Sequence, residues 1–420
     1  MNRAGATRAK MRAAWGRQLQ WWQRRQQYSG TQRSGSRRRA WVATAASAVA
    51  GVASIEAYAR WDRNQMRSSS TPELPLIYNP AAFAAHWDQH VCVQLSRVGT
   101  IASRVVPFML RSAWVYANHQ PQQTPQIFLP DNGGSDDAVA RLGADLRLLL
   151  VDLGPTFIKF GQMLSIRPDL LPASILKELQ KLCDAVPAFP TAEAIAVIES
   201  EFGRGAVVRM FDGLDASTEP IAAASLGQVY CVTLRDQGKG TQVAVKVQRP
   251  DMVAAVSLDL LLLRRYMHVV ESVKSALMHT GLLAQRKQFD IELLDSFASA
   301  SFFELDYEHE AANQQRFLHE LERRGLSSTV RVPQVHHAAT SRRVLTTEWI
   351  QGKQLAHSSP ATIRRLVPSG VRVFLVQLLD MGFFHSDPHP GNLLVDTQGR
   401  LVLVRLFPPP TDASCACLYL

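Results

Sequence analysis

Two stretches rich in β-branched residues near the middle of the chain predict a β-hairpin. Residues 228–234 (QVYCVTL) and residues 243–247 (VAVKV) have the composition of strands, because β-branched side chains pack well on a pleated surface. Residues 236–240 (DQGKG), which lie between them, are rich in turn-forming types. We therefore expect the two stretches to pair with each other.

Helices are predicted on both sides of this hairpin. One begins at residues 154–155 (GP), because proline suits the first helical turn. Residues 303–313 (FELDYEHEAAN) form an acid-rich segment that we interpret as helical, and the apolar run at residues 373–379 predicts a helix before a polar loop. Residues 393–395 and 401–404 are short apolar runs that suit strands.

The polar loop at residues 385–392 (HSDPHPGN) has the spacing H-x-D-x-x-x-x-N of a kinase catalytic loop. Phosphoryl transfer needs a carboxylate that orients the acceptor hydroxyl, and Asp387 is the candidate. It also needs a ligand for magnesium, and Asn392 is the candidate. Two other interpretations stay open: a plain polar loop between a helix and a strand, and a metal site built from His385, Asp387 and His389.

Kinase chemistry needs a lysine that grips the nucleotide phosphates and an acidic partner for that lysine. Lys246 lies in a stretch close to the V-A-I-K pattern of kinases. A lysine in a strand usually faces solvent, but the valines and alanine around Lys246 indicate that it enters a cleft. Glu310, in the acid-rich segment, is its predicted partner.

An alanine-rich stretch directly before the hairpin is the candidate loop over the phosphates. An ordinary kinase uses three glycines here, whereas this stretch keeps one. Alanine restricts the backbone angles that glycine leaves open, so we expect a stiffer loop. Its candidate residues are Ala222, Ala223, Ala224, Ser225 and Gly227.

Six motifs in one order resemble a known family. They are K-F-G-Q at residues 159–162, the alanine-rich stretch, residues 243–250, E-L-D at residues 304–306, residues 344–352 and the loop at residues 385–392. Together they resemble the UbiB family of atypical kinase-like proteins, also called aarF-domain or ABC-one kinases. The resemblance extends from about Val139 to Leu403.

This resemblance implies an α+β, protein-kinase-like fold of two lobes with a helical N-terminal extension that carries the K-x-G-Q motif and lies across the active site. Lys159 and Gln162 would then point at the nucleotide. Glu304 and Asp306 would hold the extension in place through Lys159. In the hinge between the lobes, the backbone of Glu348 and Ile350 would contact the adenine.

The resemblance also implies a function. Members of the family bind ATP with Mg²⁺ and behave as ATPases or small-molecule kinases that support isoprenoid quinone and prenyl-lipid metabolism. The expected partners are a nucleotide and enzymes of the quinone or prenyl-lipid pathways, with peripheral contact to membranes or lipid droplets. The distribution of charge, and not the resemblance, argues against nucleic acid as a partner, because the 35 basic and 36 acidic residues after residue 55 nearly cancel.

One family residue is replaced in this chain. The family carries Asp-Phe-Gly after the last strand, and its aspartate is the main magnesium ligand, whereas this chain has Arg405-Leu406-Phe407. Arginine cannot ligate a cation. Residues 405–420 resemble nothing in the family, and the chain is interpreted as truncated within the second lobe. Three functions therefore compete: an active ATPase or small-molecule kinase, a nucleotide-binding pseudokinase scaffold, and a product that does not fold.

The charge of the chain is concentrated at its N-terminus. The formal net charge is +10, and eleven of the 46 basic residues lie in residues 1–55, which contain no acid. This basic, acid-free region is rich in alanine and serine, as organelle transit peptides are. The run at residues 78–87 (YNPAAFAAHW) resembles the segment before the domain in plastid members of the family, and it slightly favours a chloroplast over a mitochondrion. An apolar content of 46 % is enough for a buried core, and the five cysteines show no disulfide pattern.

These observations divide the chain into six segments. They are a transit peptide with a weakly apolar stretch (1–60), a helical pre-domain with a linker (61–138), the helical K-x-G-Q extension (139–220), the first lobe with a helical insert (221–352), a partial second lobe (353–404) and an atypical tail (405–420). The apolar stretch at residues 41–58 is interrupted by Glu56 and is shorter than a typical membrane span. It is interpreted as part of the signal or as a weak membrane contact.

Overall fold

The computed structural model describes residues 55–60, 62–63, 74–118, 136–168, 170–183, 187–236, 239–279, 291–381 and 393–404. The chain divides into two compact units, residues 1–67 and 68–420. In the first unit, residues 55–60 and 62–63 are helical, and Arg60 pairs with Glu56 one turn away at 3.9 Å. Among the helices that are described, none combines the length and the apolar character needed to cross a bilayer.

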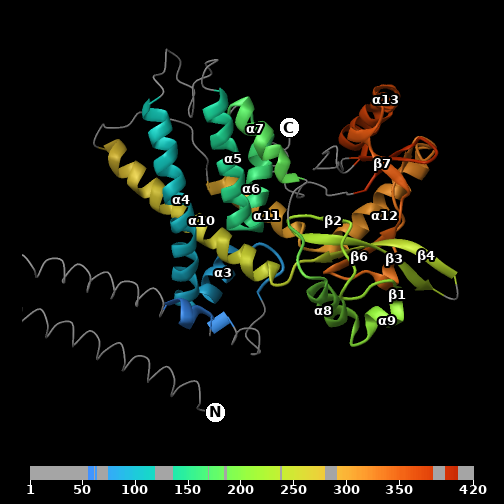
Figure 1. Cartoon of the computed structure of the whole chain (residues 1–420), viewed down its shortest axis with the longest axis horizontal. Coiled ribbons are helices and arrows are strands. Elements are labelled where there is room, and N and C mark those ends of the chain that lie inside the picture. Colours follow the sequence, from blue (N-terminus) through green and yellow to red (C-terminus); the bar gives the residue numbers. More distant parts are fainter. Residues whose placement is uncertain are drawn as a thin grey trace, which may run out of the picture. The chain divides into compact units, whose positions relative to one another are not determined.

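The second unit begins with a group of helices (Figure 1). They are α3 (Pro80–Trp87), α4 (Val91–Asn118), α5 (Asp136–Leu153), α6 (Pro155–Ser165) and α7 (Ala173–Gln180), followed by the short helix η1 (Lys181–Cys183). Leu150, Phe157, Ile158 and Leu179 lie in their shared core. The predicted helix start is confirmed: Pro155 is in the first turn of α6, and Gly154 before it has a φ of 99°, which glycine adopts readily.

Gly161 of α6 explains why the K-x-G-Q motif contains a glycine. A Cβ atom at this position would lie 2.5 Å from Leu182 Cδ1 and 2.6 Å from Leu150 Cδ1. A side chain at this position would therefore displace the side chains of Leu150 in α5 and Leu182 in η1. The absence of a side chain allows α6 to pack closely against Leu150 and Leu182. This packing holds in place the helix that carries Lys159 and Gln162.

The first sheet follows two helices, α8 (Thr191–Phe202) and α9 (Ala206–Met210). Its strands are β1 (Phe211–Asp212), β2 (Ala222–Ala223), β3 (Gly227–Asp236), β4 (Lys239–Gln248) and β6 (Val344–Glu348). The order is β1-β3-β4-β6, with β2 also paired to β3, and all pairs are antiparallel. The predicted hairpin is confirmed as β3 and β4, and Tyr230, Val243 and Val245 face a fully buried core beneath the sheet.

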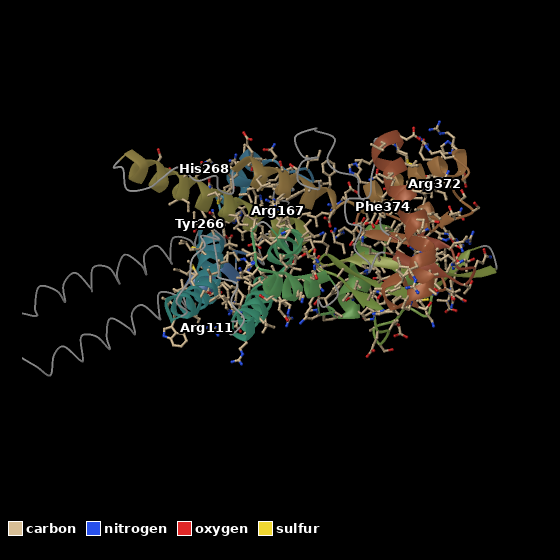
Figure 2. All side chains as sticks on the ribbon, turned by 90° about the horizontal axis from the view of Figure 1, so that it is seen from above. Arg111, Arg167, Tyr266, His268, Arg372 and Phe374 are labelled. Carbon is tan, nitrogen blue, oxygen red and sulfur yellow. The ribbon has the colours of Figure 1, made fainter. Side chains whose placement is uncertain are left out.

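In the described part of the chain, β4 is followed by the helices α10 (Met252–His279), α11 (Ile291–Phe303) and α12 (Tyr307–Arg323). The long helix α10 packs against α3, α4, α6 and α11. Figure 2 shows the side chains on these elements, among them the exposed Tyr266 of α10. Residues 303–313 were predicted as one helical segment, and this is wrong at its start, because α11 ends at Phe303 and α12 begins at Tyr307.

The second sheet contains the short strands β5 (Val330–Arg331), β7 (Gly352–Gln354), β8 (Leu393–Asp396) and β9 (Leu401–Leu403). Its order is β5-β9-β8-β7, with β5 parallel to β9. The short helices η2 (His337–Ala339) and η3 (Leu355–His357), the helix α13 (Pro360–Val376) and the π-helical turn η4 (Gln377–Met381) complete this part. Phe317 of α12, Val373 of α13 and Leu401 of β9 share its core. The predicted strands at residues 393–395 and 401–404 are confirmed, and so is the α+β class.

Candidate functional site

Lys246 and Glu310 form an ion pair at the centre of the first sheet. Lys246 Nζ lies 2.5 Å from Glu310 Oε2, and the exposed fractions of the two side chains are 14 % and 2 %. Lys246 Nζ also lies 4.2 Å from the centre of the Tyr307 ring, where the ring face attracts a cation. The predicted pair is therefore present, and it holds the ammonium group from two sides.

The start of α12 places the carboxylate of this pair. Asp306 is the N-cap: its side chain accepts hydrogen bonds from the backbone N–H groups of Glu308 and His309 at 3.0 and 3.4 Å. The helix therefore begins at Tyr307, and Glu310 lies in its first turn. The positive end of the helix dipole favours a carboxylate at this place.

A second lysine–glutamate pair joins the K-x-G-Q helix to the end of α11. Lys159 Nζ lies 2.5 Å from Glu304 Oε2 and 2.7 Å from Oε1, and the exposed fractions of the side chains are 12 % and 16 %. The expected contact of Lys159 with the E-L-D motif is confirmed for Glu304. Asp306, the other carboxylate expected to hold the extension, instead caps α12.

Gln162 has a partner inside the extension. Its side-chain amide donates a hydrogen bond to the carbonyl of Leu182 in η1 at 3.0 Å. Lys159 and Gln162 thus both contact protein groups in this structure. A direct contact of either side chain with a nucleotide stays a prediction.

The alanine-rich stretch is a strand followed by a tight turn. Ala222 and Ala223 form β2, and the N–H of Ala224 donates to the carbonyl of Gly227 at 2.7 Å to close the turn. A Cβ atom on Gly227 would lie 2.5 Å from the carbonyl oxygen of Val247 and 2.7 Å from Tyr307 Oη. The single glycine is thus retained because the turn passes directly over β4 and Tyr307.

Arg249, at the end of β4, anchors this turn. Its backbone N–H donates to the carbonyl of Leu226 at 2.9 Å, and its guanidinium donates to the carbonyl of Ala224 at 3.2 and 3.3 Å. The guanidinium also lies 5.2 Å from the centre of the Phe189 ring. Burial lowers the pKa of Arg249, although an arginine keeps its charge at neutral pH.

Phe189 is itself held by the buried side chain of Gln228 in β3. The Gln228 amide donates to the carbonyl of Phe189 and accepts from its N–H, both at 3.0 Å. Phe189 lies just before α8, within the segment of the K-x-G-Q extension (139–220). The phosphate-loop candidate is therefore tied, through Arg249 and Gln228, to the chain that leaves the K-x-G-Q helices.

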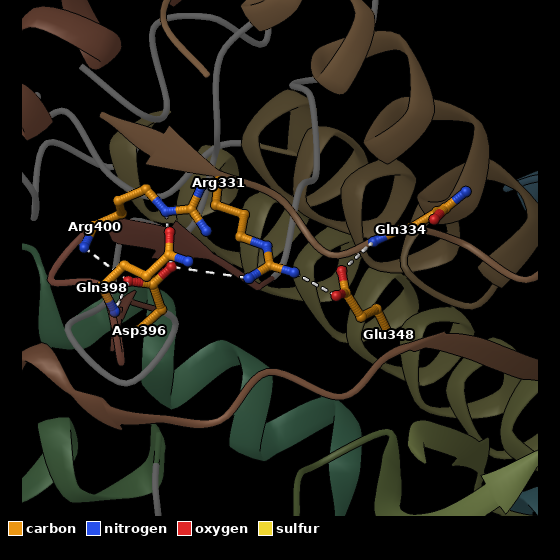
Figure 3. A network of polar contacts seen from close by, with 6 residues as sticks. All are labelled: Arg331, Gln334, Glu348, Asp396, Gln398 and Arg400. Atoms are coloured by element: carbon orange, nitrogen blue, oxygen red, sulfur yellow. Dashed lines mark hydrogen bonds and ion pairs between the residues drawn. The ribbon is translucent and has the colours of Figure 1, made fainter. Parts of the chain in front are cut away.

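The predicted hinge follows the last strand of the first sheet. The N–H of Glu348 donates to the carbonyl of Gln334 at 2.8 Å, and the N–H of Trp349 donates to the carbonyl of Gln242 at 3.2 Å. The Glu348 carboxylate contacts the guanidinium of Arg331 (Figure 3). Ile350 is buried. The side chain and the backbone N–H of Glu348 are thus engaged within the protein, and a contact of its backbone carbonyl with the adenine stays a prediction.

Several predicted residues lie outside the described part of the chain. Asp387 and Asn392 are in the loop between η4 and β8, with His385 and His389, and Arg405 follows β9. Their predicted roles therefore stay predictions. Within the described ranges, no group of three or more histidine, cysteine, aspartate or glutamate side chains is arranged to hold a metal.

A comparison with protein-family models identifies the fold. The model described as the ABC1 atypical kinase-like domain matches residues 181–405, more than half of the chain. The chain belongs to the ABC1 atypical kinase-like family. The predicted kinase-like fold is thereby confirmed, and the ABC1 match includes both Lys246 and Glu310, whereas Lys159 precedes it.

Individual relatives agree with the ABC1 assignment. The chain is 42 % identical over 277 residues to Activity of bc1 complex kinase 3, chloroplastic, of Arabidopsis thaliana, a match that covers 65 % of this chain and 37 % of that protein. It is 37 % identical over 278 residues to Activity of bc1 complex kinase 1, chloroplastic, of the same plant, covering 65 % and 38 %. A probable protein kinase UbiB of Cellvibrio japonicus is 35 % identical over 259 residues, covering 60 % and 44 %. The matches thus span less than half the length of each of these relatives.

Sequence reasoning missed the residues that brace this ABC1 site. Arg249 lies within the motif at residues 243–250, but the motif does not indicate that its side chain reaches back to Ala224. Phe189 and Gln228 are 39 residues apart, and nothing in their neighbourhoods indicates that they pair. The start of α12, by contrast, had a signal in the sequence. Asp306 precedes it, and aspartate is a preferred N-cap residue.

Proposed function

We propose that this chain binds ATP beside Lys246 and acts as an ATPase or small-molecule kinase that supports prenyl-lipid or isoprenoid quinone metabolism. The observation that carries the proposal is the ion pair of Lys246 with the nearly inaccessible Glu310. A lysine held in this way is a fixed positive charge, and nucleotide phosphates need such a charge. The membership of the chain in an atypical kinase family supports the same chemistry.

The described residues include candidates for contacts with both the phosphates and the adenine of a nucleotide. Lys246 would meet the phosphates, and the turn that ends at Gly227 would cover them with its backbone. The backbone of Glu348 and Ile350 would contact the adenine. Because Arg249 fixes the turn, the phosphate groups would meet a preformed surface, which lowers the cost of ordering on binding.

Asp387 and Asn392 complete the proposal from the sequence. Asp387 would accept the proton of the attacking hydroxyl or water, and the amide oxygen of Asn392 is a suitable ligand for Mg²⁺. When bound, Mg²⁺ would offset the charge that develops on the phosphate oxygens.

The K-x-G-Q helix would restrict what can approach the site. Lys159 fastens this helix to Glu304, six residues before Glu310 along the chain. The extension would thus cover the region that a protein substrate needs and favour a small acceptor. The chloroplastic names of Arabidopsis relatives and the basic, acid-free region at residues 1–55 support action in a plastid. Enzymes of the quinone or prenyl-lipid pathways and a membrane or lipid-droplet surface are the partners that this setting suggests.

A second candidate function is a nucleotide-binding pseudokinase that acts as a scaffold. The specific observation in its favour is Arg405, which takes the place of the aspartate that ligates magnesium in the family. Arginine would repel the metal, so binding could persist while hydrolysis is slow. Under this alternative, nucleotide binding depends on Lys246 but hardly on Mg²⁺.

Thermal unfolding of the full chain with ATP or ADP, each with and without Mg²⁺, tests the proposal. We expect the midpoint of unfolding to rise with nucleotide, and the Lys246→Met substitution to remove that rise. Lys177→Met is the matched control, because Lys177 is an exposed lysine of α7 outside the site. Phosphate release in the presence of Mg²⁺ then separates the enzyme from the scaffold. No nucleotide-dependent rise in the unmodified chain would refute both functions.

A further inference from the structure

Arg331 joins the predicted hinge to the second sheet. It belongs to β5, and its guanidinium contacts the carboxylate of Glu348 at the end of β6 (Figure 3). On its other side, Arg331 Nη1 lies 3.8 Å from Asp396 Oδ2 at the end of β8. One arginine thus lies between carboxylates from two different sheets.

Asp396 is the fixed end of this arrangement. Its carboxylate accepts from the backbone N–H groups of Gln398 and Arg400 at 3.0 and 2.8 Å and from Arg400 Nε at 2.9 Å. Burial alone would raise the pKa of Asp396, but the hydrogen bonds from Arg400 and Gln398 outweigh burial and hold this pKa below its usual value. Asp396 therefore stays charged and well bonded whether or not Arg331 is present.

The Glu348 carboxylate, unlike that of Asp396, depends on Arg331 for its charged partner. Among the described residues, Arg331 is its charged partner, and the N–H of Gln334 adds a longer hydrogen bond of 3.4 Å. Its side chain is only 31 % exposed, so the pair is partly shielded from solvent and salt. The backbone N–H of Glu348 also donates to the carbonyl of Gln334 at 2.8 Å. Glu348 is thus held at its carboxylate and at its N–H, and the two contacts together set the direction of its carbonyl.

We propose that Arg331 is a positioning residue for the hinge, which sets the direction of the backbone groups that recognise the base of a nucleotide. This inference rests on the proposed function, because it takes the backbone of Glu348 and Ile350 as the adenine contact. Arg331 also lies beside Val402 in the pairing of β5 with β9, so the brace is built into the second sheet. It acts on base recognition and leaves phosphate binding, which belongs to Lys246, unchanged.

The test measures the affinity of the full chain for two probes, ADP and inorganic tripolyphosphate, by titration calorimetry. In Arg331→Met, we expect affinity for ADP to fall about five- to tenfold, as for the loss of one charge-assisted hydrogen bond, with tripolyphosphate affinity unchanged. Arg400→Met is the matched control, since it removes the other guanidinium on Asp396 and does not contact Glu348 in Figure 3. It should leave both affinities within about twofold.

Glu348→Gln provides a second variant that keeps the size and a hydrogen-bond acceptor. It should weaken ADP binding less than Arg331→Met does, and Arg331→Met should add little in its background, since both changes act on one contact. The inference is overturned if Arg331→Met leaves ADP affinity unchanged, if it weakens both probes equally, or if Arg400→Met has the same effect. A chain that binds tripolyphosphate but not ADP refutes adenine recognition and this inference together, whereas a chain that binds neither probe refutes the proposed function as a whole.

Discussion

Two of the lysine–glutamate pairs in the described part of the chain, Lys246–Glu310 and Lys159–Glu304, have nearly the same geometry and very different surroundings. In both, the closest nitrogen–oxygen distance is 2.5 Å. The lysines are similarly shielded, with exposed fractions of 14 % for Lys246 and 12 % for Lys159. The carboxylates differ, since Glu310 is 2 % exposed and Glu304 is 16 % exposed.

This difference indicates two different roles. Glu310 lies in the first turn of a capped helix and shares Lys246 with the ring of Tyr307, so its charge depends on partners inside the protein. Glu304 lies just after the end of α11, where water can replace part of what Lys159 provides. The first pair therefore holds the site together, and the second fastens the extension with a contact that can be broken at lower cost.

The largest expected effect comes from breaking the pair of Lys246 with Glu310, which we call the inner pair. Glu310→Ala removes the carboxylate of the pair that is almost wholly buried, which water cannot replace, and we expect the free energy of unfolding to fall by about 3 kcal/mol. Urea denaturation followed by far-ultraviolet circular dichroism measures this. A loss below about 1 kcal/mol, the range of surface pairs, would remove the distinction between the two pairs.

Gly227→Ala should disturb the inner pair without changing any charge. The new Cβ atom would meet the carbonyl of Val247 and the hydroxyl of Tyr307, whose ring lies on Lys246. We expect a loss of about 2 kcal/mol, in the range of other overpacked sites, and weaker ADP binding. Gly99→Ala in α4 is the control, because nothing lies within 4 Å of a Cβ atom there. Equal losses for the two variants would show that the turn over β4 is not tightly packed.

Breaking the pair of Lys159 with Glu304, which we call the outer pair, should lower the free energy of unfolding by less. We expect Glu304→Ala to lower the free energy of unfolding by about 1 kcal/mol, because solvent reaches its carboxylate. Limited proteolysis should at the same time cut the extension faster, whereas Glu310→Ala should affect the whole chain. If Glu304→Ala costs as much as Glu310→Ala, the two pairs are equivalent and the comparison fails.

Salt should change the free energies of unfolding least, but it should distinguish the two pairs most clearly. Raising the salt concentration to about 0.5 M should shrink the cost of Glu304→Ala, because mobile ions screen a pair that water reaches. The cost of Glu310→Ala should hardly change. The measurement repeats the denaturation series at both salt concentrations. A larger salt dependence for Glu310→Ala would reverse the assignment of inner and outer pair.

Local patterns predicted the parts of the fold whose partners are close in sequence. The hairpin of β3 and β4 followed from two apolar stretches and a turn, and the start of α6 followed from Pro155. The pair of Lys246 with Glu310 was expected from the residues that kinase chemistry needs, and the contact of Lys159 with the E-L-D motif was expected only from the family resemblance. The break between α11 and α12 was missed, because the acid-rich composition suited a helix and concealed the N-cap at Asp306.

The braces around the site could not be predicted in the same way. Arg249 contacts Ala224, which lies 25 residues earlier in the chain. Gln228 binds the backbone of Phe189, so the residue type at position 189 does not indicate the contact. Arg331 contacts carboxylates 17 and 65 positions away along the chain. The Arg331 contacts depend on how the two sheets meet, and the other two depend on how distant segments fold against the first sheet; no local pattern of apolar and polar residues encodes either.

The most direct test of the central claim compares the two lysines in one binding experiment. Titration calorimetry with ADP would be performed on the unmodified chain, on Lys246→Met and on Lys159→Met. If the inner pair forms the phosphate site and the outer pair fastens the extension, Lys246→Met abolishes binding, while Lys159→Met retains it within about tenfold. Unchanged ADP affinity in Lys246→Met would contradict the account.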